Sequence, residues 1–236
     1  MKNNFTIDEI KNFWDRVAPI YELANKKVGY VHTQRFEKTI EYGNFKEGQT
    51  ILNIWSRTGN LLPYLRRIPH LTVYNREASP KMMAIAQRKY PDEKFALTDL
   101  EDLSEFSTEM FDRVVSLETL EHTPKPLVFL KELNRVLKPG GLLIMSLPPG
   151  GFEIPTRIYD FLGNNHGEGP HLFLWPGQVR KLLKDSGFRL LKHESAIILP
   201  LGNEKLTRMS EKMLTKLFGR TSLANFGVRH FYVATK

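Results

Sequence analysis

The sequence contains no cysteine. This absence excludes disulfide bonds, a thiolate nucleophile and a cysteine-ligated zinc site. No run of about 18 apolar residues occurs either, so no transmembrane helix is expected. The opening residues, MKNNFTIDEIKNFWDRV, lack the apolar core and small-residue cleavage site of a secretory signal. Together these absences agree with a cytoplasmic protein.

The chain carries a formal net charge of +8, and that charge is unevenly distributed. From Ser186 to Lys236 there are nine Lys/Arg against three Asp/Glu, a surplus of six positive charges. Such a segment could face phosphates, anionic lipid or an acidic substrate. A solvated, lysine-rich surface explains the same composition.

The middle of the chain alternates strand-like and helix-like segments, which is typical of an α/β domain with a parallel sheet. Ser79 followed by Pro80 predicts a helix start, and Lys138–Gly141 predicts a helix stop. We therefore expect a Rossmann-like, seven-stranded, mostly parallel sheet with helices on both faces and an antiparallel last strand. The expected strands are Thr50–Trp55, Leu71–Asn75, Lys94–Leu97, Phe111–Leu117, Gly141–Leu147, Phe188–Leu199 and Val228–Ala234.

We expect a single domain of 236 residues in three parts. Residues 1–45 are interpreted as an N-terminal helical cap, 46–147 as a cofactor-binding half, and 148–236 as a substrate-side half with inserts. The expected helices are Leu61–Ile68, Ser79–Tyr90, Pro124–Leu137, Pro176–Ser186 and Asn203–Phe218.

Ligands of open parallel sheets bind at the carboxyl ends of the strands, so the residues that follow each strand are candidates. Glu77 follows the second strand, about 20 positions beyond the first loop, a spacing suited to ribose hydroxyls. Asp99 follows the third strand and could accept a hydrogen bond from an adenine amino group. Helix N-capping is the alternative role for both acids.

Several segments resemble class I S-adenosylmethionine-dependent methyltransferases, especially the ubiquinone/menaquinone-biosynthesis branch. The resemblance covers roughly residues 11–147. It is most distinctive in Phe111–Gly141, where LEH is followed by RVLKPGG. Shorter resembling segments are Glu77–Met83 (EASPKMM), Asp99–Leu103 (DLEDL) and Phe13–Glu22 (FWDRVAPIYE).

This resemblance implies S-adenosylmethionine as the cofactor and transfer of its methyl group to a small molecule. Whether oxygen, nitrogen or carbon would accept the methyl group stays open, as do quinone-like, lipid and sugar substrates. A nucleic-acid substrate ranks third, because no RNA-binding module is visible. The implied cofactor-binding residues are Tyr21, Asn53, Trp55, Gly59, Glu77, Ala78, Asp99, Leu100 and Leu117.

The loop after the first strand departs from the family pattern of an acid followed by Gly-x-Gly-x-Gly. Asn53 replaces the acid, Trp55 and Arg57 replace two glycines, and only Gly59 remains. Glycine permits positive φ and a close approach of cofactor to backbone. Two interpretations follow: a remodelled loop that still binds cofactor, or a methyltransferase-like protein that serves in binding or regulation without catalysis.

Three histidines are candidate general bases: His122 after the fourth strand, and His166 and His171 in the insert HGEGPHLF. A wall residue of the pocket is the alternative for His122, and loop structure is the alternative for the other two. Glu168 lies between the latter, but the spacing matches no metal motif, so no metal site is predicted.

The helix expected at 203–218 is amphipathic, with Leu206, Met209, Met213, Leu214 and Leu217 on one face. It also carries four basic residues. A lid over the site, a helix at a membrane surface and ordinary packing against the sheet all agree with this pattern.

Overall fold

The computed structural model describes residues 5–152, 169–199, 203–219 and 221–236. A single sheet contains β1 (Thr50–Ile54), β2 (Thr72–Glu77), β3 (Phe95–Leu97), β4 (Phe111–Leu117), β5 (Leu137–Leu147), β6 (Arg189–Ala196) and β7 (Arg229–Thr235). Its strand order is β3-β2-β1-β4-β5-β7-β6. The first five strands are parallel, and β7 runs antiparallel to both β5 and β6. The expected sheet, including its antiparallel last strand, is confirmed.

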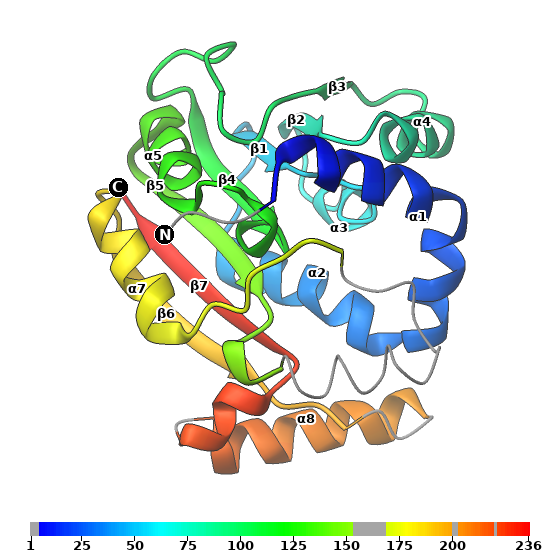
Figure 1. Ribbon diagram of the computed structural model, residues 1–236, viewed down its shortest axis with the longest axis vertical. Coiled ribbons are helices and arrows are strands. Elements are labelled where there is room, and N and C mark those ends of the chain that lie inside the picture. Colours follow the sequence, from blue (N-terminus) through cyan, green and yellow to red (C-terminus); the bar gives the residue numbers. More distant parts are fainter. Residues whose placement is uncertain (1–4, 153–168, 200–202, 220) are drawn as a thin grey trace.

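Helices cover both faces of this sheet (Figure 1). They are α1 (Ile7–Val28), α2 (Tyr30–Gly43), α3 (Leu62–Leu65), α4 (Pro80–Lys89), α5 (Pro126–Val136), α7 (Pro176–Asp185) and α8 (Glu204–Phe218). Short 3-10 turns lie at Leu120–His122, Gly150–Phe152 and Ser222–Phe226. None of the helices in the described ranges combines the length and hydropathy that a membrane span requires.

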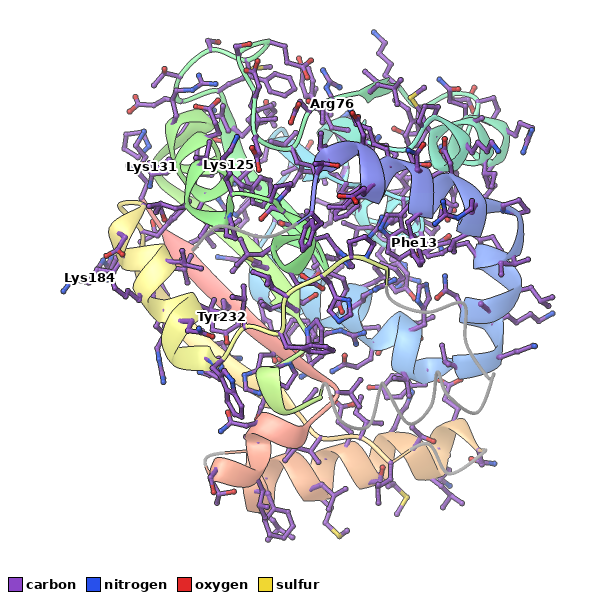
Figure 2. The ribbon with its side chains drawn as sticks, in the orientation of Figure 1. Phe13, Arg76, Lys125, Lys131, Lys184 and Tyr232 are labelled. Carbon is purple, nitrogen blue, oxygen red and sulfur yellow. The ribbon has the colours of Figure 1, made fainter. Side chains whose placement is uncertain are left out.

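Side chains alternate between two cores along each central strand, as the period of two in a strand requires. Leu52 of β1 and Val114 of β4 belong to the larger cluster, which includes residues of α5 and α7. Their neighbours Ile51 and Val115 belong to a second cluster with α2 and α3. Tyr232 of β7, which Figure 2 labels, also belongs to the larger cluster and is 1% exposed. Burial on both faces explains why these strands are nearly continuous apolar runs.

Local start signals in the sequence are confirmed. The Ser79 hydroxyl accepts a hydrogen bond from the Met82 amide at 3.1 Å, which caps α4. The Asn203 side chain caps α8 in the same way, at 2.9 Å from the Lys205 amide.

The helix expected to stop before Lys138–Gly141 does so within one residue, but the strand expected from Gly141 begins earlier, at Leu137. Helix α5 already ends at Val136, and Leu137 leaves it with an extended ψ of 135°. Leu137 then pairs with Phe111 across a register shift, so the stretch expected to stop a helix lies inside β5. Pairing with the neighbouring strand thus decided a boundary that local residues did not. Helix α3 is likewise shorter than expected, because it is a single four-residue turn.

Candidate cofactor site at the ends of β1 and β4

The loop after β1 holds two bulky residues in a backbone conformation that glycine favours. Trp55 has φ 55°, Arg57 has φ 54°, and Gly59 follows with φ 78°. For residues with a Cβ, the left-handed region costs roughly 1–2 kcal/mol each. The loop therefore keeps the alternating positive-φ course of a Gly-x-Gly-x-Gly turn although two of its glycines are absent.

The Glu77 carboxylate binds the backbone of this loop. One of its oxygens accepts from the Arg57 amide at 2.6 Å and the other from the Ser79 amide at 3.0 Å. Glu77 is fully buried, and burial raises its pKa while the Arg57 charge and the backbone hydrogen bonds lower it. Glu77 therefore connects the β1 loop to the start of α4 through a backbone hydrogen bond to each of its two oxygens.

The Arg57 side chain turns inward between two tryptophans. Its guanidinium carbon lies 3.6 Å from the Trp14 ring centre and 3.7 Å from the Trp55 ring centre. Burial lowers the pKa of Arg57, and the nearby Glu77 raises it in part. Arginine nevertheless stays protonated in proteins, so a fixed positive charge lies at the end of β1. Its Nη1 has no hydrogen-bond partner among the described residues.

Trp14 and Trp55 form a cage around the Arg57 guanidinium, and the cavity beside this cage is small. A cavity of about 20 Å³ is lined by Tyr21, Arg35, Phe36, Asn53, Trp55, Ser56, Arg57, Asn60, Leu61 and Leu117. Ligand pockets typically measure about 300–1,000 Å³. The side chains of Trp55 and Arg57 therefore lie where two glycines would leave space, and this cavity by itself is too small for a nucleoside.

A larger cavity adjoins the first and shares Phe36 and Asn60 with it. Its volume is about 620 Å³, and its walls come from α1, α2, α3 and the end of α4. Its other lining residues are Glu22, Leu23, Asn25, Lys26, Gly29, His32, Thr33, Pro63, Tyr64 and Tyr90. This volume lies within the range of small-molecule sites.

The structure brings some of the sequence-predicted residues together and separates others. Tyr21, Asn53, Trp55 and Leu117 line the small cavity, but the Asn53 amide donates to Asn75 at 2.9 Å. Ala78 and Leu100 are buried. Asp99 is exposed and accepts from the Glu101 amide at 2.9 Å, which is an interaction within its own loop. Their roles toward a cofactor stay predictions.

His122 lies inside the aromatic cluster, with its ring centre 5.6 Å from Trp14 and 5.2 Å from Trp55. Its Nδ1 is 2.9 Å from the Pro170 carbonyl oxygen, which can only accept, so Nδ1 carries the proton. Burial, followed by the Arg57 charge, holds the pKa of His122 well below its ordinary value. His122 is thus a neutral imidazole with an unprotonated Nε2. Its role as a general base stays a prediction.

Of the other two candidate bases, His171 lies among the described residues and His166 does not. The His171 ring lies 5.8 Å from that of His122, and its Nδ1 is 2.7 Å from the Gly169 carbonyl oxygen. His166 and Glu168 lie outside the described residues. Within the described ranges, no group of three or more His, Asp or Glu side chains has the arrangement of a metal site.

Sequence reasoning missed three participants. Trp14 forms half of the cage from α1, Glu118 follows β4 with φ 51°, and Arg229 of β7 pairs with Glu118 at 2.8 Å. Burial would raise the pKa of Glu118, but Arg229, Arg35 and the Ser146 hydroxyl outweigh it and lower that pKa. Trp14 belongs to FWDRVAPIYE, a segment that resembles the methyltransferase family. In contrast, no residue pattern near Arg229 indicates that it pairs with Glu118.

The sheet and its flanking helices have the Rossmann-like fold of methyltransferases. A model of the methyltransferase domain matches residues 52–145. A demethylmenaquinone methyltransferase of Chlorobaculum tepidum is 27% identical over 208 residues, which cover 76% of this chain and 84% of that protein. The chain therefore resembles the class I S-adenosylmethionine-dependent methyltransferases, in particular the quinone-biosynthesis enzymes.

Solved structures show the same fold. A protein of Thermotoga maritima described as a SAM-dependent methyltransferase superposes with a TM-score of 0.66 at 20% identity, covering 95% of this chain and 99% of its own. The [4+2]-cyclase SpnF superposes with a TM-score of 0.72 at 15% identity, covering 100% and 98%. The fold therefore extends to proteins named for another reaction, and activity must be argued from the site.

Proposed function

We propose that this protein is an S-adenosylmethionine-dependent methyltransferase of a small molecule, in which the cofactor binds only after the Arg57 side chain leaves its cage. The observation that carries the proposal is the backbone of the β1 loop. Positive φ at Trp55 and Arg57 is costly and is retained although glycine is absent. Strain of this kind persists where the surrounding structure, or a function, requires it.

The adjoining cavity supplies the space for such a rearrangement. If Arg57 turns outward, the small cavity would become continuous with the 620 Å³ cavity that shares Phe36 and Asn60 with it. Departure of the guanidinium would also remove a positive charge from the neighbourhood of a cationic sulfonium. Glu77 and Asp99 would then be the acceptors for the ribose and adenine parts, as proposed from their strand-end positions.

The relatives point to the substrate class. The similar protein of Chlorobaculum tepidum is named for demethylmenaquinone, so we propose a quinone-like small molecule for this chain. The atom that accepts the methyl group stays open. His122 is the proposed general base, because its unprotonated Nε2 is the free nitrogen of a neutral ring.

One observation favours a second function, namely ligand binding without catalysis. The 20 Å³ cavity has room for about one or two water molecules, and a fixed cation already occupies the cage. In this alternative the cluster of Trp14, Arg57 and Trp55 is a permanent part of the core, and the 620 Å³ cavity takes a different ligand.

Calorimetric titration with S-adenosylmethionine and S-adenosylhomocysteine separates the two. We expect weak binding to the unaltered protein and at least about tenfold tighter binding to Arg57→Gly, which relieves strain and empties the cage. Arg67→Ala removes an exposed arginine charge and is the control. Adding Glu77→Ala to the Arg57→Gly variant should abolish this increase in affinity for S-adenosylmethionine. No binding by either protein at millimolar ligand would refute the methyltransferase proposal and support the second function.

A further inference from the structure

Helix α8 turns its apolar side away from the protein. Leu206, Met209, Met213 and Leu217 form one stripe along it, and each is between 48% and 59% exposed. The residues that α8 buries are instead polar: Thr207, Ser210 and Glu211. A surface helix of a globular protein normally shows the reverse arrangement. The stripe is therefore an apolar surface that the described part of the chain leaves uncovered.

Polar contacts fix this orientation of the helix. Glu211 accepts from the Tyr30 hydroxyl at 2.6 Å and from the Gln34 amide at 2.7 Å, both on α2. Arg208 forms a two-bond ion pair with Glu37, also on α2, at 2.7 Å for each bond. A rotation of α8 that buried the stripe would break all four interactions, so outward exposure of the stripe belongs to the folded state.

A row of lysines accompanies the stripe. Lys205, Lys212 and Lys216 each directly precede a stripe residue, so they lie on the same flank of α8. All three are exposed, and none has an ion-pair partner among the residues that the structure describes. The acids of α8 are engaged elsewhere, because Glu204 pairs with Arg208 and Glu211 bonds to α2. The accessible charge beside the stripe is therefore positive.

Two further exposed leucines lie in the segments next to α8. Leu199 is 51% exposed and lies beside α8, since its amide and carbonyl both bond to the Ser210 hydroxyl. Leu223 is 53% exposed and belongs to the turn that follows α8. Figure 1 shows α8 and this turn along the lower border of the molecule, at the opposite end from β3 and α4. The surface lies at a border of the protein, where a flat partner can approach it.

We propose that α8 lies on an anionic lipid bilayer, with the stripe at the boundary between headgroups and acyl chains and the lysines beside the lipid phosphates. An exposed apolar face flanked by lysine is the arrangement of interfacial helices. A symmetric second copy fits less well, because it would bring two like lysine rows to one interface. The inference rests on α8 alone and does not depend on the proposed methyltransferase activity.

Vesicle flotation of the full chain tests the proposal. The probes are vesicles of phosphatidylcholine alone and vesicles that also contain phosphatidylglycerol. We expect binding to the anionic vesicles and a loss of at least about tenfold in partition for Met209→Gln/Met213→Gln/Leu217→Gln. Replacing Lys205, Lys212 and Lys216 with Gln should remove the preference for anionic lipid, and added salt should weaken the binding.

The matched control is Ile20→Gln/Leu23→Gln, which changes exposed apolar residues on α1 and should bind like the unaltered chain. Circular dichroism must show an unchanged melting transition in each variant. Equal vesicle binding by the stripe variant, or no binding by the unaltered chain, would overturn the proposal. Light scattering that shows a dimer lost in the stripe variant, without vesicle binding, would assign the surface to a second copy instead.

Discussion

The Arg57 guanidinium stacks on the Trp14 ring at 3.6 Å, and this contact joins the N-terminal helix α1 to the loop after β1. Trp55 lies against the same guanidinium at 3.7 Å, with its ring at 81° to that of Trp14. Cation–π contacts of a desolvated cation are worth about 2 kcal/mol or more. The cage thus offsets part of the cost of burying Arg57, and it couples the position of α1 to the state of the loop.

Displacement of Arg57 by a cofactor should be visible in tryptophan fluorescence. The chain has three tryptophans, of which Trp14 and Trp55 form the cage and Trp175 is 47% exposed. We expect titration with S-adenosylhomocysteine to change the emission of the unaltered protein and of Trp175→Phe. The change should be reduced in Trp14→Phe. An unaltered spectrum in a protein that binds ligand by calorimetry would mean that Arg57 stays in place.

Gly59 is expected to tolerate alanine poorly for two separate reasons. Its φ is 78°, and an added Cβ would lie 2.9 Å from the Tyr90 ring. Gly48 has a similar φ of 76° but open space around the added atom. Both variants should lose about 1 kcal/mol in unfolding free energy from backbone strain, and Gly59→Ala should lose more. Urea denaturation measures the difference, which should shrink when Tyr90 is also replaced by alanine.

The Glu118–Arg229 pair should contribute strongly to stability, because both side chains are largely buried. Arg229→Met would leave the Glu118 carboxylate with the Ser146 hydroxyl and the charge of Arg35, but without its ion-pair partner. Breaking a buried pair from one side costs about 3–5 kcal/mol, whereas Lys181→Met at the exposed Lys181–Asp185 pair should cost less than about 1 kcal/mol. A double Glu118→Gln/Arg229→Met variant should lose less than the sum of the single changes. Similar losses at both sites would contradict this interpretation.

Acid should destabilise the fold through its buried histidines. Burial lowers the pKa of His32, His122 and His230, and it lowers that of His193 to about 4. The unfolded chain therefore binds these protons first, near pH 6.5. Stability should be unaffected above about pH 6.5 and should fall below it, by at most about 1.4 kcal/mol per pH unit for each histidine. For His193 the loss should end near pH 4.

His193→Gln isolates one of these contributions. Because this side chain is only partly buried, we expect it to reduce the acid slope of unfolding free energy by less than the full value for one histidine. His70→Gln changes a side chain that is 78% exposed and is the control. Denaturation curves between pH 7.5 and 4.5 measure both slopes. An identical slope in His193→Gln would show that His193 does not contribute to the acid sensitivity.

The sequence by itself determined the class of fold and most of its elements. Apolar runs of strand length alternate with helical periods, and Ser79–Pro80 marks a helix start at the observed residues. These signals succeed because capping and periodicity act within a few residues of one another. The resemblance to the methyltransferase family also identified the loop after β1 as abnormal, since Trp55 and Arg57 stand where the family has glycine.

Only the tertiary structure decided what those residues do. Trp14, Trp55 and Arg57 meet because α1 folds back over the sheet, and Glu118 meets Arg229 because β7 inserts beside β5. The amphipathic pattern of 203–218 could not say which way its apolar face points, since bonds from Glu211 and Arg208 to α2 fix that rotation. Contacts between segments distant in sequence leave no local periodicity, so they become visible only when the chain is folded.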